Sequence, residues 1–314
     1  MSTADDEDKE LDEFVEALSA VISVFANEVV AFRRIERYLD PPLATLAVPE
    51  EVAALTGRVE ALSGRLGGPP RLLLVDSRTG RAEGNTVYDT YGAAALDEMT
   101  RGFHRARSAA LRAHAIFIVL EGLKAHPELL KGDEDDGARQ WRRGVMENQF
   151  WEALELATIR LCSFSDRMGQ VLDFVFFNVR QYERDGFAAV MDRIHANFSV
   201  AEPLFAGHSA WRTLRGYQTD ASEMGFQWLV RRRNLVVHSV ALKQSAGDGE
   251  DPIFLAAYNH LEATVVKKLR QGGEDEELGR IHAHLNVGAK AYSAVLDLCM
   301  FGVETYGLRP PRLT

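Results

Sequence analysis

Apolar residues recur every three or four positions over most of this 314-residue chain, which is the spacing of one buried face of a helix. The longest such segment runs from about Met146 to Gln181, and its apolar surface is wide enough to need several packing neighbours. The same spacing predicts further helices, at about 10–38, 49–66, 94 or 101 to 126, 185–198, 206–217, 220–238, 253–271 and 274–306. We therefore predict an all-α fold, a helical bundle.

Two segments interrupt this helical pattern. Residues 71–76 are typical of a strand and 85–88 are a candidate partner, which predicts a small β insertion at about 71–88. An acidic run bounded by glycines at 132–137 is typical of a solvated linker. We place a domain boundary there, between an N-terminal helical region at 1–137 and a second helical domain at 138–314.

The predicted helix at 220–238 ends in polar side chains suited to phosphate chemistry: Arg231, Arg232, Arg233, Asn234 and His238. Residues four apart share a helix face, so Asn234 and His238 point the same way, with Arg231 near that face. Histidine exchanges a proton near neutral pH, arginine presents a fork of donors to phosphate, and an amide orients either group. These groups are enough for metal-free transesterification of RNA, in which a 2′-hydroxyl attacks the phosphodiester.

The segment from Arg233 through Asn234 to His238, late on a helix in an all-helical domain, resembles the motif of the HEPN superfamily. That motif is an arginine, four to six residues and a histidine, usually with a polar residue directly after the arginine. The resemblance covers roughly the C-terminal half of the chain. It implies a helical bundle, a homodimer whose motifs face each other, and often metal-independent endoribonuclease activity in toxin–antitoxin or phage-defence systems. Some HEPN domains have lost the activity and only bind.

The resemblance implies a role for each residue of the motif. His238 acts on the proton of the 2′-hydroxyl or of the leaving oxygen, Arg233 stabilises the charged phosphorane, and Asn234 orients them. Arg231 and Arg232 are expected to guide the RNA backbone. No metal or other cofactor is expected.

Other interpretations of these residues remain open. The arginines are also compatible with a basic helix end that is favoured by the helix dipole, with His238 as a cap. The chain would then be a helical scaffold, and a third possibility is a catalytically inactive HEPN-like module that binds RNA, a nucleotide or a protein. Asp166 and Arg167 interrupt the long apolar helix, so they either form interhelical salt bridges or line a cleft opposite the motif.

Charge and cysteine usage limit the partners. The net charge of −10 argues against a general nucleic-acid coat and favours at most a local basic site. The HEPN resemblance implies RNA as the partner, and DNA is not expected. A second copy of the chain and an antitoxin or regulatory protein are further expected partners. Cys162 and Cys299 have apolar neighbours and are expected to be buried thiols in a reducing compartment. The acidic residues 1–13 lack the features of a signal peptide, so we expect a cytoplasmic protein without a membrane partner.

Overall fold

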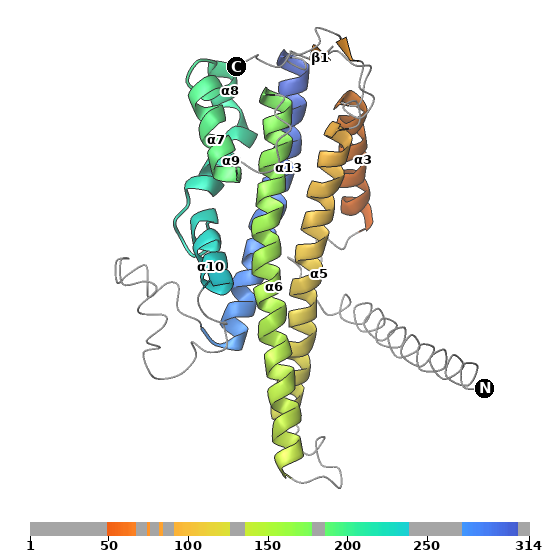
Figure 1. The fold of residues 1–314 in the computed structure, drawn as a ribbon, viewed down its shortest axis with the longest axis vertical. Helices are drawn as coiled ribbons and strands as arrows, with labels where there is room; N and C mark the ends of the chain where they lie inside the picture. The colour runs from red at the N-terminus through yellow and green to blue at the C-terminus, as the bar shows by residue number, and fades with distance from the viewer. Residues whose placement is uncertain are drawn as a thin grey trace, which may run out of the picture.

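The computed structural model describes residues 49–66, 74–75, 82–83, 91–125, 136–177, 186–238 and 272–306. These residues form a bundle of α-helices with one short pair of strands (Figure 1). The predicted all-α fold is therefore confirmed. The helices predicted at 10–38 and 253–271 lie outside the described residues.

Two long helices, α5 (Tyr91–Ala125) and α6 (Asp136–Phe177), lie side by side and run in opposite directions (Figure 1). Helix α6 contacts α5, α7, α10 and α13, which explains why its apolar residues are not confined to one stripe. It also begins well before the predicted start near Met146. The helix therefore supplies the wall against which the elements of the C-terminal half are placed.

Helix α13 (Glu274–Tyr306) runs along α6 and also packs against α5 and α3 (Pro49–Leu66). The bounds of α3 and α13 are those predicted. One hydrophobic core extends from Leu62 on α3 to Leu298 on α13, so it includes residues from both sides of the predicted boundary at 137. The described helices on the two sides of the acidic run share this core, and the domain boundary placed at 137 stays a prediction.

Strands β1 (Leu74–Val75) and β2 (Ala82–Glu83) pair in antiparallel fashion, with Leu74 opposite Glu83. This pair lies within the β insertion predicted at 71–88. The second strand predicted at 85–88 lies outside the described residues.

Short elements follow α6 in the described residues 186–238. They are α7 (Phe187–Ile194), the π-helical turn η2 (His195–Ser199), α8 (Pro203–Gly207), α9 (Ser209–Thr219) and α10 (Phe226–His238). Helix α10 begins later than predicted, because residues 220–225 form a turn. The Asp220 carboxylate accepts a hydrogen bond from the Ser222 N–H at 2.8 Å, as in an Asx turn, and does not cap a helix. The Gln227 N–H then donates back to the Asp220 carbonyl at 3.4 Å.

Gly225 makes this turn possible. A Cβ atom at position 225 would lie 2.1 Å from the Asp220 carbonyl oxygen, which is backbone and cannot move aside as a side chain can. The close approach therefore requires glycine at this position. It ends the turn and sets the start of α10, the helix that carries the predicted catalytic motif.

Candidate functional site

Helix α10 buries one face and exposes the other. The buried residues recur at helical spacing and include one arginine: Phe226, Trp228, Leu229, Arg232 and Leu235. The side chains of Asn234 and Val237 are exposed. Because buried and exposed positions alternate within the motif, its three arginines have different surroundings.

Arg232 lies in the core, with only 1 % of its surface exposed. Its Nη2 is 2.9 Å from the Glu277 Oε1 on α13, and its guanidinium lies over the Trp228 ring, 5.6 Å from the centroid. Arg232 falls four residues after Trp228 and three before Leu235, so helix geometry places it on the buried face. The predicted contact of Arg232 with RNA does not fit this position, and the residue anchors α10 instead.

Glu277 is the centre of a wider polar network. It accepts hydrogen bonds from Arg280 Nη1 at 2.5 Å and from the Gly272 N–H at 2.8 Å, in addition to its ion pair with Arg232. Arg280 Nε also lies 3.3 Å from the Glu223 carboxylate in the turn before α10. The network therefore joins this turn, α10 and the first turns of α13, and it fixes the rotation of α10 about its axis.

The outward residues of the motif are Arg231 and Asn234, with Arg233 beside them. Arg233 Nη1 donates to Asn234 Oδ1 at 3.0 Å. Arg231 is half-buried and makes no hydrogen bond or ion pair with the described residues. His238 is the last residue of α10, four positions after Asn234, and its side chain lies outside the described residues. The structure thus gives positions for Arg231, Arg233 and Asn234 side chains, and for the His238 backbone.

Asp166 and Arg167 have different surroundings on α6. Asp166 accepts a hydrogen bond from the Phe187 N–H at the start of α7, at 3.4 Å. Asp166 is exposed as a residue, but neighbouring atoms keep water from its carboxylate, and this desolvation raises the pKa of Asp166. The hydrogen bond from the Phe187 N–H and the charges of Arg233 and Arg167 oppose that rise. Arg167 donates to Gln170 on its own helix at 2.8 Å. Of these two residues, Asp166 is therefore the one that interacts electrostatically with Arg233.

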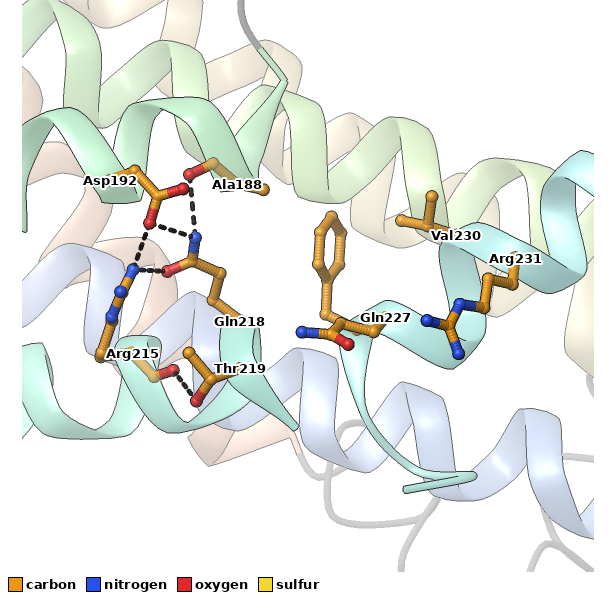
Figure 2. A pocket seen from close by; sticks show the side chains of 9 residues that line it. Ala188, Asp192, Arg215, Gln218, Thr219, Gln227, Val230 and Arg231 are labelled. Carbon is orange, nitrogen blue, oxygen red and sulfur yellow. Dashed lines mark hydrogen bonds and ion pairs between the residues drawn. The ribbon is translucent and has the colours of Figure 1, made fainter. Parts of the chain in front are cut away.

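A hollow of about 430 Å³ lies beside α10, between it and helices α7 and α9 (Figure 2). Its lining combines apolar, amide and charged side chains: Ala188, Asp192, Arg215, Gln218, Thr219, Phe226, Gln227, Val230 and Arg231. Arg231 is the one residue that belongs to both the motif and this lining. The other lining residues were not predicted, because they come from three helices and form no local pattern in the sequence.

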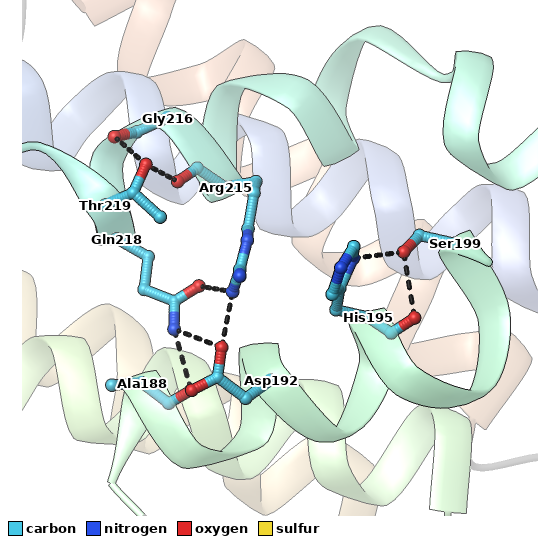
Figure 3. Close-up of polar contacts among 8 residues, drawn as sticks. All are labelled: Ala188, Asp192, His195, Ser199, Arg215, Gly216, Gln218 and Thr219. Atoms are coloured by element: carbon cyan, nitrogen blue, oxygen red, sulfur yellow. Dashed lines mark hydrogen bonds and ion pairs between the residues drawn. The ribbon is translucent and has the colours of Figure 1, made fainter.

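The side chains of Asp192, Arg215 and Gln218 in this lining form hydrogen bonds to one another (Figure 3). Arg215 Nη1 lies 2.5 Å from the Asp192 carboxylate and donates to Gln218 Oε1. Gln218 Nε2 donates to Asp192 at 3.0 Å and to the Ala188 carbonyl at 2.9 Å. Hydrogen bonds from Arg215 and Gln218 hold the pKa of Asp192 below its usual value. The positive charge of Arg215 is therefore balanced within the wall of the hollow.

A serine–histidine pair lies on η2, next to this network (Figure 3). Ser199 Oγ is 2.5 Å from His195 Nδ1 and also donates to the His195 carbonyl at 2.9 Å. The His195 ring is parallel to that of Trp211, with centroids 6.2 Å apart. Neither His195 nor Ser199 lines the hollow, and the hydroxyl is engaged with its own helical turn, so we assign this pair to local structure.

Comparison of the chain with protein-family models, with curated protein sequences and with solved structures finds no match.

In the described part of the chain, no three or more His, Cys, Asp or Glu side chains are grouped so that they could hold a metal ion. No described helix has both the length and the apolar character needed to cross a membrane. Cys162 and Cys299 are buried free thiols, as predicted, and burial raises the pKa of both.

The ion pair of Arg232 leads to the first prediction. Arg232→Ala should lower the free energy of unfolding by about 3 kcal/mol, because it breaks a buried ion pair. This is the lower end of the usual range, since Glu277 keeps its hydrogen bonds from Arg280 and the Gly272 N–H. Arg231→Ala is the matched control and should change it by less than about 0.5 kcal/mol. Urea denaturation of the two variants and the wild type measures both values. Equal effects of the two substitutions would contradict the anchoring role of Arg232.

His284 on α13 leads to a prediction about pH. Its ring stacks on Trp228, its Nε2 bonds to the Glu223 carbonyl at 2.9 Å, and burial lowers its pKa from 6.5 to about 4. The Glu223 carbonyl and the charge of Asp220 oppose this shift. The unfolded chain binds a proton near pH 6.5 and the folded chain only near 4, so the stability contributed by His284 is present above 6.5 and is lost as pH falls toward 4.

Between pH 7 and pH 5, this loss should amount to about 2 kcal/mol in urea denaturation. His284→Gln retains a donor for the Glu223 carbonyl but cannot titrate, so it should remove that part of the pH dependence. The same substitution at the exposed His195 is the control and should leave the wild-type pH dependence in place. An unchanged pH dependence in His284→Gln would show that the protein does not hold this imidazole neutral.

Proposed function

We propose that the chain is a metal-independent endoribonuclease of the HEPN type. The observation that most supports this proposal is the arrangement of the outer side of α10. There, Arg233 donates a hydrogen bond to the exposed Asn234, which lies four residues before His238 and one helical turn after Arg231, a residue that has no hydrogen bond or ion pair with the described residues. The residues to which we assign the base, the phosphate clamp and the orienting amide thus belong to one helix, which Arg232 ties to the core.

In the proposed reaction, the 2′-oxygen of a ribose attacks the adjacent phosphorus and the 5′-oxygen of the next nucleotide leaves. His238 accepts the 2′-hydroxyl proton or supplies one to the leaving oxygen. Arg233 stabilises the charge that develops on the phosphorane, and Asn234 orients the reacting groups. Arg231 contacts the RNA backbone, while Arg232 has the anchoring role described above. The products are a 2′,3′-cyclic phosphate and a 5′-hydroxyl end.

The reaction benefits from both a base and an acid, whereas one motif supplies a single histidine. A homodimer with His238 near its two-fold axis would provide the second histidine.

Such an enzyme suits a toxin–antitoxin or phage-defence setting, in which an antitoxin or regulatory protein controls it. The second candidate function is a catalytically inactive module that binds RNA or a nucleotide, and the hollow beside Arg231 favours it.

The motif variants test the proposed chemistry. His238→Ala and Arg233→Ala should each lower the RNA cleavage rate by roughly a hundredfold or more, because they remove the proton transfer and the phosphate clamp. Arg233→Lys should recover only part of the rate, since a point charge does not replace the guanidinium fork. Cleavage in the presence of EDTA is measured together with the melting temperature of each variant.

Arg105→Ala, which removes an exposed arginine on α5, is the control and should cleave at the wild-type rate. Cleavage that is abolished by EDTA and restored by magnesium would exclude the proposed mechanism. Variants that melt at lower temperature but cleave normally would remove His238 and Arg233 from the active site and favour the scaffold interpretation.

The dimer has its own test. Light scattering should give the mass of two chains at micromolar concentration, and the specific cleavage activity should fall when dilution separates them, because each site would lose one histidine. A protein that is monomeric and equally active per chain at every concentration would contradict the pairing of motifs.

A further inference from the structure

In the hollow between α7, α9 and α10, two polar side chains have no hydrogen-bond partner among the described residues and can bind a ligand. Asp192, Arg215 and Gln218 are bonded to one another, and Thr219 Oγ1 donates to the Arg215 carbonyl at 2.9 Å. Gln227 and Arg231 make no side-chain hydrogen bond with the described residues. Both project from α10, one helical turn apart, on the side that faces α9 (Figure 2).

The remaining lining of the hollow is apolar. Phe226, Val230 and Ala188 contribute it, and Phe226 is nearly buried against the core. Among the charged lining residues, Arg215 is balanced by Asp192, so Arg231 leaves one positive charge in excess. The hollow is thus complementary to a ligand with an apolar body, an edge that donates and accepts hydrogen bonds, and a single anionic group.

A nucleotide has these three features. A base has apolar faces and an edge of donors and acceptors with which a glutamine amide forms paired hydrogen bonds. A guanidinium without a protein partner is suited to a phosphate. The volume of about 430 Å³ lies within the range of small-molecule sites, roughly 300–1,000 Å³.

We infer that this hollow is a nucleotide-binding subsite, in which the base lies along Phe226 and Val230 with its edge on Gln227, and the phosphate is bound by Arg231. The inference rests on the proposed RNA substrate and makes it more specific. Arg231 is one helical turn from Asn234, so a nucleotide held here belongs to the same strand as the phosphate at Arg233 and Asn234. Gln227 is then a residue that determines which nucleotide occupies the position beside the scissile bond.

The experiment compares adenosine 5′-monophosphate with ribose 5-phosphate, which has the phosphate but no base, in calorimetric titrations of the full chain. The wild type should bind the nucleotide more tightly. Arg231→Ala should weaken binding of both probes by about tenfold or more. Gln227→Ala should weaken binding of the nucleotide by about fivefold and leave ribose 5-phosphate unaffected.

A matched control makes the result specific. Arg212→Ala removes an exposed arginine of α9 that does not line the hollow, and it should bind both probes as the wild type does. Gln227→Met, which keeps the approximate size of the side chain without its amide or a charge, replaces Gln227→Ala if the alanine variant has a lower melting temperature.

Equal affinity for the two probes would overturn the subsite, and so would nucleotide binding that is unchanged in both Gln227→Ala and Arg231→Ala. RNA cleavage by the same proteins separates the two proposals. A wild type that cleaves RNA but binds the nucleotide independently of Gln227 and Arg231 is a nuclease without this subsite. A wild type that binds the nucleotide through both residues but cleaves no RNA has the binding site and lacks the proposed activity.

Discussion

The buried ion pair between Arg232 and Glu277 determines which side of α10 the protein presents. Two charges removed from water are expensive unless each is well paired, and here Glu277 accepts two hydrogen bonds besides its ion pair with Arg232, whose guanidinium lies over Trp228. A rotation of α10 by one residue would put a neighbouring arginine into this place and expose Arg232. The pair therefore selects one rotation of the helix. It is the reason why Arg231 and Asn234 face outward although the three arginines are adjacent in the sequence.

The same anchoring gives the hollow its shape. Helix α10 forms one wall, and the other walls belong to α7 and α9, which the Asp192, Arg215 and Gln218 network ties together. Asp173 on α6 pairs with Arg193 on α7, so α7 is also fixed to the long helix. Packing around Phe226 closes the arrangement on the core side. Gln227 and Arg231, which make no side-chain hydrogen bond with the described residues, thus lie on a helix that Arg232 ties to the core, beside α7 and α9, which their own polar network holds together.

The sequence predicted the features that depend on periodicity and missed those that depend on distant partners. Helix α13 has the predicted bounds, because a strong helical pattern is preceded by Gly272 and Gly273 and opens with an acidic first turn. The start of α10 was misplaced, since the capping pattern at Asp220 is local whereas the turn that replaces it depends on Gly225 and a backbone contact. The role of Arg232 was also misjudged, because Glu277 lies far along the chain. No periodic signal could have joined Arg215, Gln227 and the other residues of the hollow.

The balance of charge argues for recognition at short range. The chain carries a net charge of −10, so its overall field repels RNA, and the described site offers only Arg231 and Arg233 as positive groups without a paired carboxylate. Long-range attraction of an RNA backbone would therefore be weak, and binding of the proposed substrate would have to draw on contacts made inside the site. In the proposed subsite, the apolar wall and the amide of Gln227 would supply such contacts, and the amide would distinguish bases as well as bind them. An enzyme built in this way would gain its affinity and its sequence preference from the same few residues.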